Sequence, residues 1–112
     1  MAKIADYTIT GKSGAEYTFA MYPYPGTWNS VACVYIITKR EVKTDGKGYH
    51  TSIYVGETED LKERHSNHHK AHCFEKYGGN CIGILQEKDD QRRLDIETDI
   101  RNNGGAWPCN DQ

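Results

Sequence analysis

The chain has 112 residues, a formal net charge of -2 and a pI near 6.2, and these values limit what it can be. Its length fits one domain with a modest core and leaves no room for a separate recognition domain. No positively charged leader precedes an apolar stretch, and no run approaches the roughly 20 apolar residues of a membrane helix. The acidic balance excludes a protein that neutralises phosphates over its whole surface. We therefore expect a cytoplasmic protein that does not enter membranes.

The cysteines favour the same compartment. They are scattered without CxxC spacing, at Cys33, Cys73, Cys81 and Cys109. In a chain without a signal peptide, such cysteines are more often free thiols than parts of a disulfide framework. We expect four free thiols in a reducing cytosol.

The first part of the chain predicts a β-hairpin. Residues 7–10 and 16–22 are rich in β-branched and aromatic side chains, and the segment 11–14 between them reads Gly-Lys-Ser-Gly. This composition is typical of two strands joined by a tight turn. Pro23 and the pair Pro25 and Gly26 end the second strand.

Two more strands are expected at residues 32–38 and 51–56, which pair across a long polar connection with an irregular tip. Residues 59–77 turn polar and helical, Gly78 and Gly79 break the helix, and 81–86 form a short strand. Asp89 or Asp90 caps a last helix that runs to about residue 102. Its apolar side chains are Leu94, Ile96 and Ile100. These elements predict an α+β fold with a small antiparallel β-sheet flanked by helices and an extra N-terminal β-hairpin.

Each of the two apolar strands carries one tyrosine. Side chains alternate between the two faces of a strand, so Tyr35 points to the face away from Val34 and Ile36. Tyr54 likewise points to the face away from Ile53 and Val55. With a suitable register, both hydroxyl groups lie on one side of the sheet. The simpler interpretation is a cross-strand aromatic pair, which adds about 0.2 to 1 kcal/mol to a sheet.

Polar side chains follow the second tyrosine in a distinctive order. The run Tyr54-Val55-Gly56 leads to Arg64, and His68 comes four residues later on the same helical face. Glu97 lies within the last expected helix, and Asn110 is near the end of the chain. This ensemble resembles the GIY-YIG nuclease family over residues 32–110, although Cys33 stands where the family usually has glycine.

The resemblance implies a GIY-YIG-like β-β-α-β-α core at 31–110, extended by a hairpin at 1–30, in one domain over 1–112. It implies a DNA endonuclease that hydrolyses phosphodiester bonds with one Mg²⁺ or Mn²⁺ ion. The implied catalytic residues are Tyr35 as general base or water-orienting group, Tyr54 holding the scissile phosphate or a water, Arg64 stabilising the phosphate, His68 relaying a proton and Glu97 binding the metal. Gly56 and Asn110 would support the site.

DNA would have to bind through a local basic patch, because the net charge is negative. The patch consists of Lys62, Arg64, His65, His68, His69, Lys70, His72 and Lys76. Lys39 and Arg40 would add base or phosphate contacts beside Tyr35, unless these charges only keep a hairpin tip soluble. The protein would act as a monomer or a weak dimer.

Four alternatives remain open from the sequence. Arg64 could pair with Asp60 along a helix, and Glu97 could be an ordinary solvated carboxylate. The histidines at 65, 68, 69 and 72 could hold zinc together with Cys73, since imidazole and thiolate are zinc ligands. A catalytically silent module that binds nucleic acid or another protein could also retain the same fold and residues.

Overall fold

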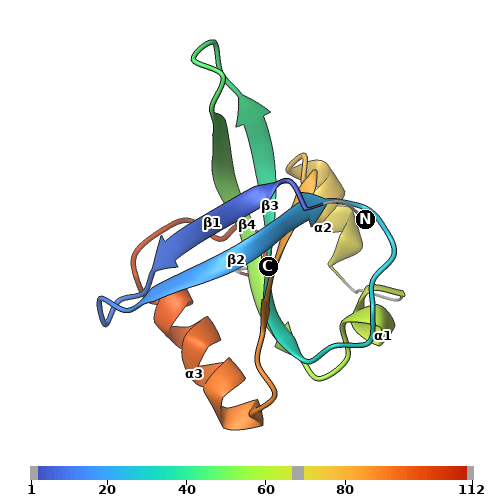
Figure 1. Cartoon of the computed structure of the whole chain (residues 1–112), viewed down its shortest axis with the longest axis vertical. Coiled ribbons are helices and arrows are strands. Elements are labelled where there is room, and N and C mark those ends of the chain that lie inside the picture. The colour runs from blue at the N-terminus through green and yellow to red at the C-terminus, as the bar shows by residue number, and fades with distance from the viewer. Residues whose placement is uncertain (1–2, 67–69, 111–112) are drawn as a thin grey trace.

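Among the residues that the structure describes, one curled antiparallel sheet of five strands has three helices around it (Figure 1). The structure is a computed structural model, and it describes residues 3–66 and 70–110. The strand order is β1-β2-β5-β3-β4. The elements are β1 Ala5–Thr10, β2 Glu16–Pro23, β3 Cys33–Val42, β4 Gly48–Thr58, α1 Leu61–Ser66, α2 Ala71–Lys76, β5 Cys81–Gln86 and α3 Asp90–Arg101. This is an α+β fold, as expected. Among the described residues, no helix has the length and apolar character required to cross a membrane.

The predicted N-terminal hairpin is confirmed and belongs to the same sheet as the later strands. β1 and β2 pair from Ala5 opposite Met21 to Thr10 opposite Glu16. Gly14 at the turn has a φ of 90°, a conformation that residues with a side chain rarely adopt. β2 then pairs with β5, from Ala20 opposite Ile84 to the end of the strand. The hairpin therefore extends the sheet that carries the two tyrosines.

The hairpin of β3 and β4 is longer and more regular than the expected one. The ladder continues to Val42 opposite Gly48, with one irregularity between Ile37 and Thr38. The backbone N–H of Lys43 donates to the carbonyl of Lys47 and closes the turn. This part projects from the body of the protein as an arm at the top of Figure 1. The prediction of a long irregular tip was wrong, because the polar residues there complete the strand ladder.

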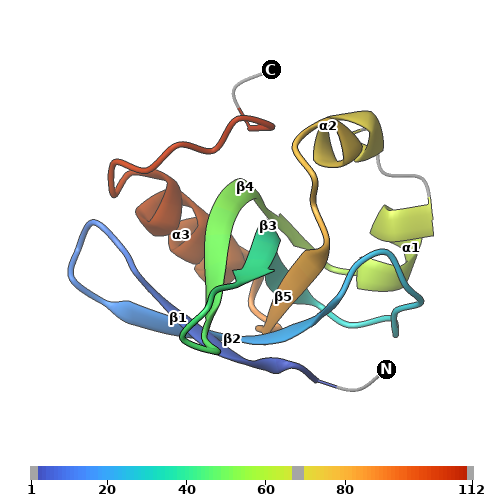
Figure 2. The ribbon, with the colours of Figure 1, turned by 90° about the horizontal axis from the view of Figure 1, so that it is seen from above.

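Helices cover both faces of the sheet, with α3 on one side and α1 and α2 on the other (Figure 2). Alternation along β3 divides the core accordingly. The cluster on the α3 face contains Phe19, Met21, Val34, Ile36, Val55, Cys81, Ile96, Ile100 and Trp107. The cluster on the α1 and α2 face contains Cys33, Tyr35, Ile37, Ile53, Tyr54, Leu61, Cys73, Phe74, Ile82 and Cys109. The tyrosines thus belong to the core beneath α1 and α2.

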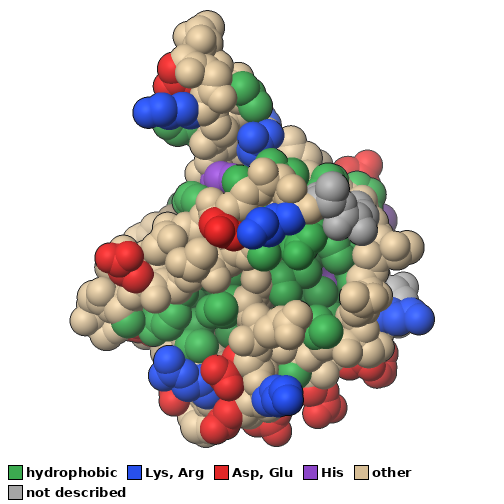
Figure 3. Space-filling model, in the orientation of Figure 1, with side chains coloured by type: hydrophobic (Ala, Val, Ile, Leu, Met, Phe, Trp, Pro, Cys, Tyr) green, Lys and Arg blue, Asp and Glu red, His purple; other side chains and the backbone are tan. Residues whose placement is uncertain are grey.

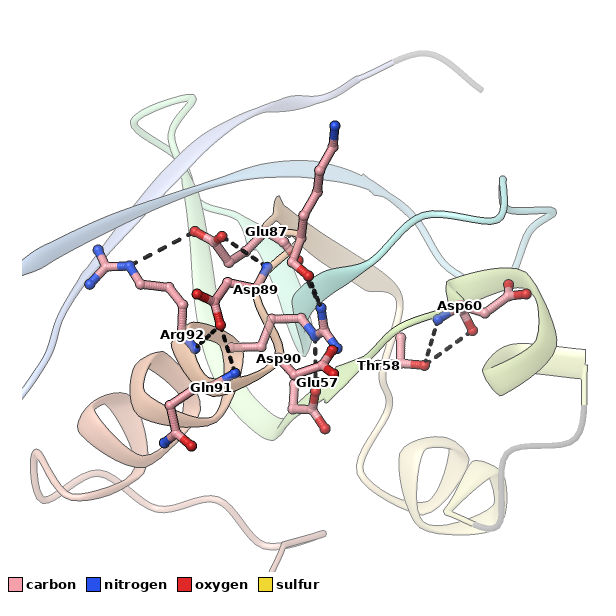
Figure 4. Close-up of polar contacts among 10 residues, drawn as sticks. Glu57, Thr58, Asp60, Glu87, Asp89, Asp90, Gln91 and Arg92 are labelled. Atoms are coloured by element: carbon pink, nitrogen blue, oxygen red, sulfur yellow. Dashed lines mark hydrogen bonds and ion pairs between the residues drawn. The ribbon is translucent and has the colours of Figure 1, made fainter.

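The single helix expected over residues 59–77 is replaced by two short helices. Leu61 of α1 and Phe74 of α2 are both fully buried against the same face. They are 13 positions apart, and at about 100° per residue one straight helix would point them in nearly opposite directions. Two helices are needed to bury both. Asp60 begins α1, with Oδ1 accepting from the Glu63 N–H, while Asp60 and Thr58 also bond to each other (Figure 4).

The last helix begins as predicted, since the Asp89 carboxylate accepts from the N–H groups of Gln91 and Arg92 (Figure 4). Its buried residues are Arg93, Ile96 and Ile100. Leu94, expected on the apolar face, is 46% exposed. Two positions along a helix rotate a side chain by about 200°, so Leu94 and Ile96 cannot share a face. An arginine occupies the buried position instead.

The prediction of four free thiols was wrong. Cys73 of α2 and Cys109 near the C-terminus form a disulfide, with 5.8 Å between their Cα atoms. Cys33 and Cys81 are free and buried. The two linked cysteines lie 36 positions apart in the chain, and only the packing of α2 beside the C-terminal segment brings them together. Spacing alone therefore gave no sign of the pair.

Candidate functional site

The register of β3 and β4 places Tyr35 and Tyr54 side by side. Tyr35 lies opposite Gly56, and Tyr54 lies opposite Ile37, so the tyrosines are diagonal neighbours on one face. Their ring centroids are 5.9 Å apart with an interplanar angle of 37°. Tyr35 is fully buried and Tyr54 is 8% exposed. The expectation that both side chains lie on one side of the sheet is confirmed.

Gly56 leaves the space that the two rings occupy. A Cβ atom at this position would lie 2.7 Å from Cε1 of Tyr54 and 2.9 Å from both Cζ and the hydroxyl oxygen of Tyr35. These distances are shorter than any carbon side chain tolerates, and neither buried ring has room to withdraw. Glycine at position 56 is therefore a packing requirement of the tyrosine pair.

We expect Gly56→Ala to lower the free energy of unfolding by about 1–3 kcal/mol, since the added methyl group overpacks a buried site. Chemical denaturation followed by circular dichroism measures the change. Gly105→Ala is the matched control, because the nearest atom to a Cβ there is Trp107 Nε1 at 3.8 Å. Equal stabilities of the two variants would contradict the packing role.

Electrostatics keep both phenols neutral. Burial is the largest cause that raises the pKa of Tyr35, and it outweighs the lowering by the Arg64 charge. Burial also raises the pKa of Tyr54, against smaller opposing effects of hydrogen bonding to Tyr35 and of Arg64. A phenolate base at Tyr35 would need a lowered pKa, and the structure shows the opposite. The raised pKa therefore argues against the general-base role of Tyr35.

His65, which the sequence placed in the basic patch and in the possible zinc set, is a central neighbour of the tyrosine pair. Its ring centroid lies 5.0 Å from Tyr35, 6.0 Å from Tyr24 and 6.2 Å from Trp28. Burial, and then the charge of Arg64, lower the pKa of His65 to about 4. The imidazole is therefore neutral at pH 7. Its spacing of four residues from the buried Leu61 was the signal that could have found it.

The neutral state of His65 predicts a dependence of stability on acid. The folded-state pKa lies below the ordinary value of 6.5, so the unfolded chain binds this proton first. Stability is then full above pH 6.5 and falls by about 2–3 kcal/mol as the pH drops to 4. Urea denaturation of the wild type and of His65→Phe across this range tests the effect. Parallel curves for the two proteins would refute it.

Glu97 approaches the tyrosines from α3, on the other side of β4. It is half-buried, and burial is the largest cause that raises its pKa. The negative charge of Glu57 raises the pKa of Glu97 further, while the positive charges of Arg101 and Arg64 lower it. The charge of Glu97 in turn raises the pKa of Tyr54. Glu97 is therefore no ordinary solvated carboxylate, and it shares an electrostatic environment with Tyr54 and Arg64.

Arg93 fixes the position of α3 against β4. Its Nε donates to Oε1 of Glu57 at 3.0 Å, Nη1 donates to the carbonyls of Glu87 and Lys88, and Nη2 bonds to the Asp90 carboxylate. Figure 4 shows Glu57 and Asp90 converging at the start of α3. Arg93 is 3% exposed and lies one turn before Glu97. This arginine, which the sequence did not assign to the site, sets the depth at which α3 presents Glu97.

The residues around Glu97 fit a single Mg²⁺ or Mn²⁺ ion. Magnesium keeps several waters and usually takes one or two protein carboxylates together with substrate phosphate oxygens. Glu97 supplies a hard oxygen ligand, and a cation would offset the repulsion from Glu57 that raises the pKa of Glu97. Within residues 3–66 and 70–110, no three His, Cys, Asp or Glu side chains gather into a metal cluster. Glu97 is thus the residue that would hold the ion.

Asn110 holds the outer edge of β4 beside Tyr54. Its Oδ1 accepts from the N–H of Val55 at 2.9 Å, and its Nδ2 donates to the carbonyl of Val55 at 2.8 Å. The backbone N–H of Cys109 donates to the carbonyl of Ile53. The C-terminal segment therefore pairs with β4 between Ile53 and Val55, directly before Gly56.

The remaining candidates divide into three groups. His68 and His69 lie outside the described residues. Lys39 and Arg40 lie on the arm beyond Thr38 and are therefore several residues from Tyr35 along β3. Lys39 forms an ion pair with Glu41 there, with 3.7 Å between Nζ and Oε1. Lys62 is exposed on α1 and lines a hollow next to the tyrosine side of the sheet.

Comparisons with known proteins return no family model, no curated protein and no solved structure that matches the chain.

Proposed function

We propose that the chain is a divalent-cation-dependent DNA endonuclease with a GIY-YIG-type site and the corresponding β-β-α-β-α core. The observation that carries the proposal is the packing of Tyr35 and Tyr54 over Gly56, within the electrostatic reach of Arg64 and Glu97. A cross-strand aromatic pair explains the ring contact alone. It does not explain why the Arg64 charge and the half-buried Glu97 carboxylate, from two separate helices, both act on the pKa of Tyr54.

The side chains divide the work of phosphodiester hydrolysis. Arg64 is permanently charged, and its planar group binds phosphate oxygens and stabilises the charge that develops on them. Tyr35 remains neutral, so its hydroxyl orients the attacking water while Tyr54 holds the phosphate. Glu97 is the metal ligand, and a divalent cation bound there supplies further stabilisation of phosphate charge. His68 keeps its expected role in proton transfer as part of the proposal.

Two residues act by positioning in this scheme. Arg93 holds Glu97 at the level of β4 through Glu57, and Asn110 holds Val55 so that Tyr54 and Gly56 keep their places. Neither touches the reacting phosphate. They explain how residues from two neighbouring strands, β3 and β4, and two helices can form one site.

The test is cleavage of fluorescent duplex, flap, branched and single-stranded DNA by the purified protein. We expect cleavage with Mg²⁺ or Mn²⁺ and none with EDTA, because phosphate charge is stabilised in part by the cation. Binding is measured in parallel by fluorescence anisotropy in EDTA. Binding without cleavage on any substrate would replace the nuclease with the silent nucleic-acid-binding module, and the absence of both would contradict each assignment.

A further inference from the structure

A hollow of about 480 Å³ opens beside the tyrosine pair, within the usual size of ligand sites. Its floor is the face of the sheet that carries Tyr35, since Ile84 pairs directly with Tyr35 and both point to the same side. Tyr22 and Gln86 extend this floor along β2 and β5. Its wall comes from the segment between β2 and β3, and its rim from α1. Figure 3 shows hydrophobic side chains gathered on this face, between β2 and that segment.

The lining combines aromatic rings with free amide groups. Trp28 and Tyr22 are half-buried, and their ring centroids lie 6.3 Å apart at 71°. Asn29 and Gln86 are exposed at the hollow, and no hydrogen bond joins either amide side chain to another described residue. Aromatic faces stack on nucleobases, and amides bond to the edges of unpaired bases. The chemistry of the hollow therefore suits a flat, hydrogen-bonding ring.

Charge at the rim favours a nucleic-acid strand. Lys62 lines the hollow, and no carboxylate does so among the described residues, although the whole chain has a net charge of -2. The N–H of Leu61 donates to the carbonyl of Val31 at 3.0 Å, which ties the start of α1 to the wall. Lys62 is thereby placed beside the opening, where a phosphate next to a bound base would lie.

One imidazole separates the hollow from the tyrosine pair. The His65 ring lies between Trp28, at 6.2 Å, and Tyr35, at 5.0 Å. β5 and β3 are neighbouring strands, and such strands are about 4.8 Å apart. A base in the hollow and a phosphate beside the tyrosine pair can therefore belong to neighbouring nucleotides of one DNA strand.

We propose that this hollow binds one unpaired nucleobase, stacked on Trp28 or Tyr22 and hydrogen-bonded by Asn29 or Gln86. The inference rests on the proposed nuclease function and narrows its substrate class to DNA with an unpaired base beside the cut. Single-stranded, flapped and mismatched DNA qualify, whereas intact duplex does not, because a stacked base pair cannot enter a hollow of this kind. Lys62 contacts the strand through phosphate.

The experiment compares the affinity for a fluorescein-labelled single-stranded DNA of eight thymidines with that for the same strand made abasic throughout. Anisotropy is measured in EDTA, so that binding is separated from cleavage. We expect the wild type to prefer the base-bearing strand by about tenfold or more, in line with the stacking of one base. Trp28→Ala should abolish the preference and Trp28→Phe should retain most of it. Tyr77→Ala is the control, since Tyr77 is an exposed aromatic residue that does not line the hollow.

A second variant guards against misfolding of Trp28→Ala. Gln86 is exposed, so Gln86→Ala leaves the core intact, and we expect it to weaken binding of the base-bearing strand only. An unchanged preference in both variants, or no preference in the wild type, would overturn the proposal. Cleavage of DNA without any base preference would support the nuclease function and contradict base binding in the hollow. Base preference without cleavage would support base binding and contradict the nuclease function.

Discussion

Replacement of Glu97 by glutamine will lower DNA cleavage at least 10²–10³-fold, the loss expected when one group that stabilises transition-state charge is removed. Glutamine has nearly the same shape as glutamate and lacks the charge that binds a divalent ion. Glu97 is only half-buried, so the fold should survive the change. Initial rates of cleavage of the best substrate, at saturating Mn²⁺, measure the effect.

Arg64→Ala should cause a loss of similar size, since it removes the permanent charge next to the phosphate. Asp95→Asn is the matched control for Glu97, because Asp95 is exposed on the same helix and, among the described residues, accepts a hydrogen bond only from the side chain of Gln91. Arg92→Ala is the matched control for Arg64→Ala, because the Arg92 side chain is 61% exposed. If either site variant cuts like its control, the assignment of that residue is wrong.

The second large effect concerns the disulfide between Cys73 and Cys109. A crosslink that spans 36 positions reduces the entropy of the unfolded chain, and its loss should lower the free energy of unfolding by about 3–4 kcal/mol. We expect the double variant Cys73→Ser, Cys109→Ser to unfold at a correspondingly lower urea concentration. Equilibrium denaturation by circular dichroism measures the difference.

Treatment with a reducing agent provides the control for this prediction. It should destabilise the wild type to the level of the double variant and leave the double variant unchanged, since Cys33 and Cys81 are already free. Reduction should also lower cleavage, because Asn110 follows Cys109 directly and holds Val55 at the edge of β4. A wild type that keeps its stability under reduction would show that the two cysteines are not bonded in solution.

Local sequence signals predicted what depends on near neighbours in the chain. The turn residues 11–14 predicted the first hairpin, and Asp89 predicted the start of α3. Alternation along each strand predicted that Tyr35 and Tyr54 share a face if the register suits, and the structure supplies that register. The turn, the cap and the alternation each follow from residues that are close together in the chain. They were accessible because helix and strand periods are short.

Features that join distant segments were mispredicted or missed. The expectation of free thiols failed because the pairing of Cys73 with Cys109 depends on where α2 and the C-terminal segment pack. One helix was expected over 59–77, yet burial of both Leu61 and Phe74 requires two. Arg93 was not assigned to the site, because its partner Glu57 lies on β4, far away in the sequence.

The α+β fold class and the chemical groups available for a site follow from the amino-acid sequence alone. Tyrosine, arginine and glutamate at these positions are set by the chain, and so is the glycine that lets two rings meet. Which of these side chains lie close together depends on the tertiary structure, because sheet order and helix packing bring together residues far apart in the chain. That packing brought Glu97 within the electrostatic reach of Tyr54 and placed His65 beside Tyr35. It also formed the hollow next to the tyrosine pair. Burial then raised or lowered the pKa of each group, since desolvation depends on the whole fold and not on sequence neighbours.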